Sequence, residues 1–551
     1  MLRRLIVPDR QLGGTPIEGV DSGHMEDQRY TPLDVQLMAG LGSLALVAAI
    51  LMAWYITERL PHLEDEIAYL FQARTLARGA LAAPVPFDES PFFTPFVLPI
   101  NGHRVGKYPI GWPLILAAGE AIGAGWLVNP LLGALTVVLT YALGRDLFNR
   151  QVGLIAGLLA LTSPFFLIQS STYMSHAAAA LWTALFTYAF LRSESARARG
   201  QPGRGWVMAM GLAAGMLAIT RPLTAVAVML PFGVFLLVQS IRQGVAFHAL
   251  ARAYWPGALM MVAIALLQPL YLTLVTGSPT TNLYRLVWPY DRIGFGPGFG
   301  PSEGGHSLRQ ALITARIDLQ MWASDLFGWP GCSWVPVVPG LILGTVQIRP
   351  ERKAWPGLLV GIFASLVVVH LAYWVGGNLY GPRYYYEAHA GLAVVGAVGL
   401  VSSTRLAVRA IRWLVSRRTC QKLPAELPIP AWPACLLVAT LVAVGMLTYL
   451  PSRLSDWHGM YGISREPLDH LAGLAGERPV LVLVRGGLWN QYASFFALNS
   501  PWYDGPVVAA HDLNLRSSYA VMAMYPNRDV WFYSNGQFSP EPFPYDGAPP
   551  P

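Results

Sequence analysis

The sequence LMAGLGSLALVAAILMAWYI, residues 37–56, runs for twenty residues without a charged side chain. About 20 apolar residues are what an α-helix needs to cross the hydrocarbon core of a bilayer. Similar runs recur along most of the chain, which is 54% hydrophobic and only 13% charged, whereas a soluble domain has about 25% charged residues. The sequence therefore predicts a polytopic membrane protein and argues against a soluble enzyme.

Twelve apolar runs are candidate membrane spans, near residues 37–56, 109–125, 126–144, 152–169, 176–191, 206–219, 222–240, 255–276, 329–348, 355–376, 384–402 and 431–450. Most of the arginines and lysines between them lie in five connections, 145–151, 192–205, 241–254, 349–353 and 403–422. Since basic loops mark the cytoplasmic side, we interpret the net charge of +7 as a record of topology and expect no nucleic-acid partner.

The basic loops alternate cleanly with the uncharged ones only if one early run does not span. The best candidate is PIGWPLILAAGEAIGAG, residues 109–125, which is short and contains two prolines and Glu120. It suits a helix at the membrane interface. We therefore predict about eleven transmembrane helices in the cell (inner) membrane, with the N-terminus cytoplasmic and the C-terminus extracytoplasmic.

This topology divides the chain into four parts: a cytoplasmic tail (1–36) without a signal-peptide pattern, a transmembrane domain (37–450), a small α/β extracytoplasmic domain (451–540) and a disordered end (541–551). Two outer loops, 57–126 and 277–328, belong to the transmembrane domain, and the second contains an expected amphipathic helix, Leu308–Phe327. In the α/β domain we expect strands at Pro479–Val484, Pro506–Ala510 and Asp529–Tyr533 and a helix at Asn514–Met524.

The densest group of acidic residues follows the first span, in PHLEDEIAYLFQARTLARG, residues 61–79. The apolar residues there have helical spacing and predict an amphipathic juxtamembrane helix on the outer membrane surface. Glu64, Asp65 and Glu66 occupy its first turn, and Asp65 and Tyr69 share a face. Acids also favour a helix start through the macrodipole, but three carboxylates beside lipid are costly unless they have a function.

This segment resembles the first outer loop of the GT-C glycosyltransferases, in which an Asp-Glu pair after the first span is followed three residues later by Tyr. The nearest resemblance is to glycosyltransferase family 39 and its kin, of the protein O-mannosyltransferase and aminoarabinose-transferase type. KYPIGWPL, residues 107–114, resembles the Lys-Pro-Pro-Leu segment that ends the same loop, with Tyr108 replacing the first proline. In topology the resemblance covers roughly 37–450, but it is specific only at short places, which also include 162–166, 173–176, 220–222, 284–306 and 381–385.

The resemblance implies inverting transfer of a sugar from a polyprenyl-phosphate donor to a glycan, lipid or protein acceptor. It implies that Asp65 is the catalytic base and Glu66 a supporting carboxylate. The donor's phosphate would be bound by a set of cationic and tyrosine side chains, namely Lys107, Arg383, Arg221, Tyr69 and Tyr384. A substrate-covering loop and its surroundings would add Asp291, His306 and His176.

Simpler interpretations remain open for several of these residues. Lys107 could be a hydrated charge on a solvent-exposed loop, and Arg221 and Arg383 could extend to the membrane interface. Tyr384, Tyr385 and Tyr386 are typical of an interfacial aromatic belt, and a histidine at a span's end, such as His176, more often has a structural hydrogen bond.

No cofactor is expected. Glu64, Asp65 and Glu66 could hold Mg²⁺ or Mn²⁺, but the next outer loop, QSSTYMSH (169–176), has no carboxylate, which favours the metal-independent branch of the resemblance. The three cysteines are far apart and predict neither a disulfide framework nor a zinc site. The alternative functions are a transporter or lipid flippase, which should have charges in the middle of its spans, and a scaffold whose outer domain binds a partner.

Overall fold

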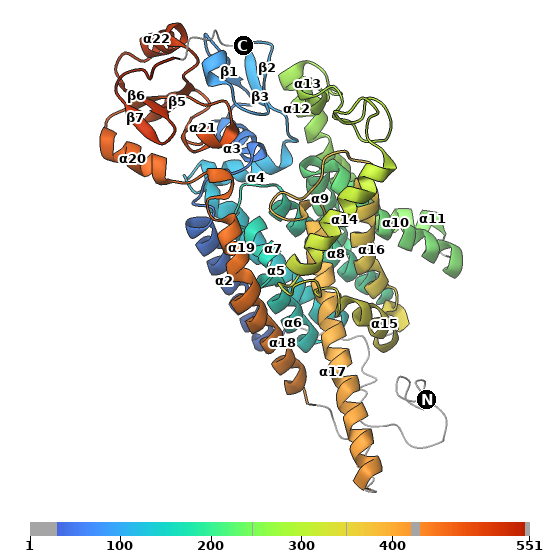
Figure 1. Cartoon of the computed structure of the whole chain (residues 1–551). Helices are drawn as coiled ribbons and strands as arrows, with labels where there is room; N and C mark the ends of the chain where they lie inside the picture. The colour runs from blue at the N-terminus through green and yellow to red at the C-terminus, as the bar shows by residue number, and fades with distance from the viewer. Residues whose placement is uncertain (1–29, 245, 349, 420–429, 546–551) are drawn as a thin grey trace.

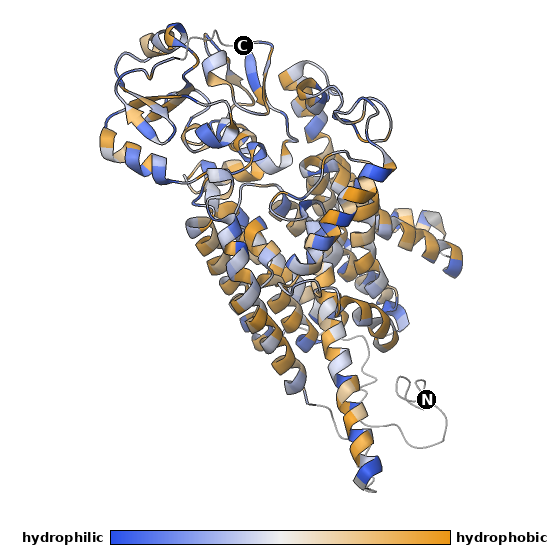
Figure 2. Ribbon diagram, in the orientation of Figure 1, coloured by the Kyte–Doolittle hydropathy of each residue, from blue (hydrophilic) through white to orange (hydrophobic). Residues whose placement is uncertain are grey.

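The computed structural model describes residues 30–244, 246–348, 350–419 and 430–545. The expectations for most of the cytoplasmic tail and for the last residues of the disordered end lie outside these ranges. A bundle of apolar helices carries a smaller unit of mixed helices and strands at one end (Figure 1). Hydrophobic residues dominate the helices of the bundle, whereas the smaller unit mixes hydrophobic and hydrophilic residues (Figure 2). We call the end of the bundle beneath that unit the capped end and the opposite one the far end.

Seven helical segments among the described residues are long and apolar enough to cross a membrane. They contain α2 (Pro32–Tyr55), α5 (Val128–Leu147), α10 (Pro222–Gln243), α11 with α12 (Phe247–Ala265, Leu267–Thr276), α16 (Trp355–His370), α17 (His389–Thr419) and α18 (Trp432–Val444). Three shorter apolar helices lie among them, α6 (Arg150–Leu161), α9 (Arg204–Thr220) and α15 (Val337–Gln347). With the largely buried α8 (His176–Ala198), the described residues have a helix at each of the eleven predicted spans, and seven of these segments are long and apolar enough to cross a membrane.

Residues 109–125, which the distribution of basic loops excludes as a membrane span, contain the short helix α4 (Gly111–Glu120). Ten residues at 1.5 Å per residue extend about 15 Å, half of the roughly 30 Å hydrocarbon core. α4 packs closely on the end of α9, since a Cβ on Gly111 would lie 2.7 Å from the carbonyl oxygen of Ile219. It lies across the capped end and does not cross the bundle.

The acidic segment forms α3 (Glu64–Ala77), as predicted, but its environment differs from the prediction. Residues 66–73 are all buried, so α3 is not an amphipathic helix with a polar face in water. It packs on α4, and Ile67 shares a hydrophobic core with the C-terminal domain. Next to it lies an unpredicted antiparallel sheet with strand order β1-β3-β2, formed by Ala83–Pro84, His103–Gly106 and Val97–Ile100.

The C-terminal domain has a four-stranded sheet in the order β5-β4-β6-β7. Its strands are β4 (Val480–Val484), β5 (Val507–His511), β6 (Asp529–Ser534) and β7 (Gln537–Ser539), and its helices are α20 (Glu466–Ala475), α21 (Trp489–Phe496) and α22 (Leu515–Met524). The first three strands are parallel, and all five residues of β4 are buried, as expected for a strand covered on both faces. The predicted strands and helix are confirmed to within one residue, whereas α20, α21 and β7 are additional.

The second outer loop contains α13 (Leu283–Val287) and α14 (Leu308–Asp325), and α14 confirms the helix expected at Leu308–Phe327. Between them the chain turns repeatedly, and Gly296, Gly298 and Gly300 have φ values of 97°, 82° and 81°. Residues with side chains rarely adopt such values, which explains why this stretch is rich in glycine. The loop lies beside the first outer loop at the capped end (Figure 1).

Candidate active site

A cavity of about 1160 Å³ lies at the capped end of the bundle. Its walls come from four parts of the chain that are distant in sequence: the first outer loop, the starts of α8 and α10, the second outer loop, and the segment 370–384 that precedes α17. Four residues of the C-terminal domain, Tyr461, Leu488, Trp489 and Asn490, complete the wall. Of the ten predicted site residues, eight line this cavity, and Glu66 and His306 do not.

Asp65 faces the cavity from the first turn of α3, and its side chain is 22% exposed. One carboxylate oxygen, Oδ2, lies 3.6 Å from Nη1 of Arg383, and the other accepts a hydrogen bond from the Tyr108 hydroxyl. Burial alone would raise the pKa of Asp65, but the charges of Arg383 and Lys107 and the Tyr108 hydrogen bond outweigh it and lower the pKa. Asp65 is therefore ionised at neutral pH and can accept a proton.

Glu66 faces the opposite way and has a structural position. Its Oε2 accepts hydrogen bonds from the backbone N–H groups of His62 (2.8 Å) and Leu63 (2.9 Å) and from the Tyr380 hydroxyl (3.0 Å). Its Oε1 accepts one from the backbone N–H of Tyr173 at 2.7 Å. Burial raises the pKa of Glu66 to about 7, against the lowering effect of these donors. The side chain thus fixes the start of α3, and Asp65 with it, relative to the neighbouring loops.

Lys107 follows β3 and is 5% exposed. Its ammonium nitrogen lies 3.4 Å from the ring centroid of Phe96 and 4.7 Å from that of Trp288, with Tyr108 and Tyr284 at 5.1 and 5.4 Å. Such ring faces attract a cation. Burial lowers the pKa of Lys107, while the carboxylates of Asp65, Asp291 and Glu64 act in the opposite direction. The enclosure holds a desolvated positive charge at the cavity wall.

Arg383 and Arg221 bring two further cations to the same cavity. Arg383 opens a short 3₁₀ segment, η4 (Arg383–Ala388), and is 5% exposed. Its Nε and Nη1 are buried and donate no hydrogen bond to any residue that the structure describes. Arg221 lies between α9 and α10, with Nε 3.3 Å from Oε1 of Glu387 and Nη1 3.3 Å from the Ser175 hydroxyl. Both guanidinium groups point into the protein, unlike the interfacial side chains of the simpler interpretation.

The tyrosines of the site are also internal. Tyr384, Tyr385 and Tyr386 are 8%, 3% and 1% exposed, so the aromatic-belt interpretation is wrong: their backbone forms the buried η4 segment and not a lipid-facing turn. The Tyr384 ring lies beside both arginines, 5.4 Å from Cζ of Arg221 and 5.6 Å from that of Arg383. Tyr69 also lines the cavity, with its hydroxyl 3.3 Å from that of Ser175.

The remaining predicted residues separate into two groups. Asp291 lines the cavity, and its Oδ1 accepts hydrogen bonds from the Tyr373 hydroxyl (3.2 Å) and the Trp374 indole (3.1 Å). His176 lines it too, with Nδ1 3.3 Å from Oε1 of Glu387. His306 instead stacks on Phe295 and pairs through Nε2 with the carbonyl oxygen of Leu371 at 2.9 Å. It stabilises the second outer loop away from the cavity.

Sequence reasoning missed Glu387, which is 1% exposed and links His176 to Arg221. The only feature of the sequence that could have indicated Glu387 is that it is the lone carboxylate in GPRYYYEAHA (381–390), at the start of an apolar run. It also missed Trp489, whose indole donates to the carbonyl oxygen of His62 at 3.0 Å. No group of three His, Cys, Asp or Glu side chains within the described ranges is arranged to hold a metal ion. Independence of metal stays a prediction.

Residues 114–271 match the family model described as dolichyl-phosphate-mannose-protein mannosyltransferase. Among solved structures, ArnT from Cupriavidus metallidurans bound to undecaprenyl phosphate aligns over 91% of both chains with a TM-score of 0.53 and 15% identity. Its apo state aligns over 86% of both chains with a TM-score of 0.49 and 16% identity. The oligosaccharyltransferase AglB from Archaeoglobus fulgidus, in complex with an inhibitory peptide and a dolichol-phosphate, covers 91% of this chain and 69% of its own, with a TM-score of 0.49 and 12% identity.

No curated protein matches the chain by sequence. The alignment with ArnT extends over nearly the whole of both chains, from the bundle to the capped end, and shows that this chain has the GT-C fold. The segment matched by the family model begins in α4 and ends in α12. It therefore includes Arg221 and His176, but lies after Asp65 and Lys107.

Proposed function

We propose that this protein is a glycosyltransferase that moves a sugar from a polyprenyl-phosphate donor to an acceptor hydroxyl. The proposal rests on one observation: the ionised carboxylate of Asp65 and three poorly exposed cations line the same cavity. Lys107, Arg383 and Arg221 supply the positive charge that a departing phosphate requires. The cavity is at the end of a membrane bundle, where a lipid-linked donor can place its phosphate while its chain stays in the bilayer.

In the proposed reaction, the acceptor oxygen attacks the anomeric carbon while its proton moves to a carboxylate oxygen of Asp65. The bond between the anomeric carbon and the phosphate oxygen breaks, and the electron pair leaves with the lipid phosphate. Positioned cations stabilise the negative charge that develops there. The Nε–H and Nη1–H groups of Arg383 are the first candidates for this contact, because they are buried near Asp65 and donate no hydrogen bond to the described residues. One displacement inverts the anomeric centre.

The proposal extends to the acceptor and to the location. A cavity of about 1160 Å³ exceeds the roughly 300–1,000 Å³ of common ligand pockets and leaves room for a sugar and an acceptor together. A glycan, a lipid or a protein side chain could each present the hydroxyl. We assign the capped end to the extracytoplasmic side of the cell membrane, since the basic connections lie at the far ends of the helices.

The test is release of lipid phosphate from a polyprenyl-phosphate sugar by the purified full-length protein in nanodiscs, with candidate acceptors added. Wild-type protein should release lipid phosphate, and Asp65→Asn should slow this by about 10²-fold or more, because a positioned base contributes that much. A matched control is Asp88→Asn, the same substitution in the same outer loop, at a residue that does not line the cavity. Its rate should stay within about twofold of wild type.

The same experiment separates the alternatives. A transporter or flippase would move the intact lipid-linked sugar between leaflets without releasing lipid phosphate. A scaffold protein would show no turnover in either form. Full activity in folded Asp65→Asn protein would remove the proposed base and with it this mechanism.

A further inference from the structure

The cavity that Asp65 lines, here called the Asp65 cavity, has one wall that the proposed chemistry of base and phosphate does not use. Tyr461, Leu488, Trp489 and Asn490 form this wall, and all four belong to the C-terminal domain. We call these four residues the domain wall. None of them is charged, and the three cations of the cavity come from other parts of the chain. The domain wall is therefore available for the second substrate, the acceptor.

The position of the domain wall follows from the topology of the C-terminal sheet. The chain passes from β4 to β5 on one side and then returns to β6 on the other side of β4. In open α/β sheets, ligands bind beyond the carboxyl ends of the strands, at the point where the strand order reverses. Residues 485–490 lie directly after the carboxyl end of β4 and include three of the four wall residues. The edge of the sheet that is suited to ligand binding therefore faces the Asp65 cavity.

Trp489 connects this edge to the helix that carries Asp65. Its indole N–H donates to the carbonyl oxygen of His62 at 3.0 Å, three residues before Asp65 in the sequence. Its ring packs edge-to-face with Tyr492, with the centroids 5.4 Å apart. Figure 1 shows α21, which begins at Trp489, next to α3. These contacts fix the orientation of the indole, which is only half-buried and lines the cavity.

The other three wall residues are exposed, although two of them have largely apolar side chains. Leu488 is 66% and Tyr461 46% exposed, and Asn490 is exposed as well. Tyr461 has φ 60° and ψ 14°, a left-handed conformation that residues with side chains rarely adopt. Strained backbone conformations cluster at active and ligand-binding sites. The domain wall thus presents two aromatic rings, one aliphatic side chain and one amide.

We propose that the domain wall binds a saccharide acceptor, an inference that rests on the proposed sugar transfer. The electron-rich face of an aromatic ring attracts the C–H groups on the face of a sugar ring, and an amide both donates to and accepts from hydroxyl groups. A charged acceptor would find no partner among the four uncharged side chains. A lipid acceptor would approach from the bilayer, whereas the domain wall belongs to the unit that caps the bundle (Figure 1).

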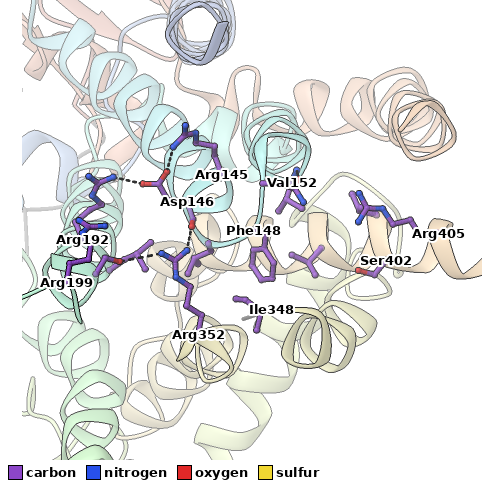
Figure 3. A pocket seen from close by; sticks show the side chains of 16 residues that line it. Arg145, Asp146, Phe148, Val152, Arg192, Arg199, Ile348, Arg352, Ser402 and Arg405 are labelled. Carbon is purple, nitrogen blue, oxygen red and sulfur yellow. Dashed lines mark hydrogen bonds and ion pairs between the residues drawn. The ribbon is translucent and has the colours of Figure 1, made fainter. Parts of the chain in front are cut away.

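The acceptor reaches the domain wall from the capped end. A second cavity, of about 320 Å³, lies at the far end and shares no described lining residue with the Asp65 cavity. In Figure 3 its residue Asp146 is paired with Arg145 at 2.8 Å and with Arg192 at 2.9 Å. Arg192 follows His176 of the Asp65 cavity by sixteen residues on α8, about 24 Å along a helix. The two cavities are separate, and the C-terminal domain adjoins only the Asp65 cavity.

The test measures lipid-phosphate release by the full-length protein in nanodiscs with three acceptor fractions from the native host's cell envelope: soluble oligosaccharides, delipidated peptides and extracted lipids. The variant is Tyr461→Ala with Asn490→Ala, which removes a ring and an amide and leaves the Trp489 contact in place. The matched control is Tyr519→Ala, because Tyr519 lies on α22 of the same domain, is 56% exposed and does not line the cavity.

Oligosaccharides should stimulate release by wild-type protein, whereas peptides and lipids should not. The double variant should need about tenfold or more oligosaccharide for half-maximal stimulation, since it loses a stacked ring and a hydrogen-bonding amide. Its KM for the donor should stay within about twofold of wild type, because the wall does not bind the phosphate, and Tyr519→Ala should behave as wild type. If the double variant does not fold, Asn490→Ala alone is measured in the same way, and its requirement for oligosaccharide should still rise.

Two results would overturn the saccharide assignment while leaving sugar transfer intact. One is stimulation by peptides or lipids and not by oligosaccharides, and the other is an unchanged oligosaccharide requirement in the folded variant. Absence of lipid-phosphate release with every fraction would instead remove the proposed function, and this inference with it.

Discussion

At the scale of single residues, the site depends on which way each side chain leaves its helix. Asp65 and Glu66 are neighbours in sequence, but successive residues of an α-helix are about 100° apart around its axis. Asp65 faces the cavity, and Glu66 accepts four hydrogen bonds on the other side. The geometry thus separates the two carboxylates: Asp65 lines the cavity, and Glu66 holds the start of its helix.

Lys107 provides a test by pH. The pKa of Asp65 is lowered below the usual value of about 3.9 and that of Lys107 is lowered from about 10.4. If Asp65 must be ionised and Lys107 protonated, kcat/KM for lipid-phosphate release should fall at low pH as Asp65 gains a proton, and at high pH as Lys107 loses one. The acidic limb should lie below about pH 4 and the basic limb below about pH 10. Both limbs are read from kcat/KM measured across pH, which reports the free enzyme.

Lys107→Arg is the matched variant for the basic limb, because a guanidinium stays charged above pH 12. Its basic limb should disappear or move up by more than one pH unit while the acidic limb stays in place. An unchanged basic limb in this variant would show that another group titrates there. The Lys107 assignment would then be withdrawn.

The sequence predicted the cationic residues of the site but not all of their neighbours. Lys107, Arg221 and Arg383 were predicted from the short segments that resemble the GT-C family, and all three line the cavity. His306 was chosen for its place in a glycine-rich loop, yet its ring is used to hold that loop against Leu371. The aromatic enclosure of Lys107 joins Phe96 with Tyr284 and Trp288, from two loops about 190 residues apart in sequence. Such contacts form only in the tertiary structure, so the local sequence around each residue does not predict them.

At the scale of elements, the C-terminal domain and the first outer loop form one packed unit. Phe92, in a 3₁₀ turn of the loop, is 2% exposed, and its ring centroid lies 4.4 Å from that of Tyr503. Arg104 of β3 donates to the Tyr503 hydroxyl, and Arg74 of α3 donates to the carbonyl oxygen of Ala497 at 2.7 Å. The domain thereby supports the elements that carry Asp65 and Lys107, in addition to supplying cavity wall.

Phe92→Ala should loosen this unit. Removing a buried phenylalanine costs about 3–5 kcal/mol, so we expect a lower Tm and faster proteolysis of the chain after residue 451. Phe87→Ala is the matched control, since Phe87 lies in the same loop and is 99% exposed. Equal protease resistance of the two variants would show that the domain is held mainly by other contacts.

Element prediction succeeded where a continuous apolar pattern was present and failed where it was absent. The apolar runs of β4 and β6 could be read directly from the sequence. The β1-β3-β2 sheet could not, because its strands have only two to four residues. Two of them, β1 and β2, also contain a proline, which argues against a strand when the sequence is read alone. The burial of α3 was also inaccessible, since it depends on a domain about 400 residues later in the chain.

At the scale of the whole molecule, the distribution of charge defines a polarity. The capped end has a carboxylate among cations, and the far end has the basic connections. Because positively charged loops are retained in the cytoplasm, the far end should be cytoplasmic and the Asp65 cavity should open to the other side. The short α4 decides this arrangement, since a twelfth span there would reverse every helix that follows it relative to α2.

A topology reporter tests that arrangement directly. A reporter fused after residue 125, directly behind α4, should read extracytoplasmic, and one fused after Gly200, between α8 and α9, should read cytoplasmic. Ten residues of α4 reach about 15 Å, so the chain leaves α4 on the same side on which α2 delivers Asp65. A cytoplasmic signal after residue 125, with the Gly200 fusion outside, would mean that α4 or its surroundings crosses the bilayer. Asp65 and Arg383 would then begin on opposite sides of the membrane, which their separation of 3.6 Å does not allow.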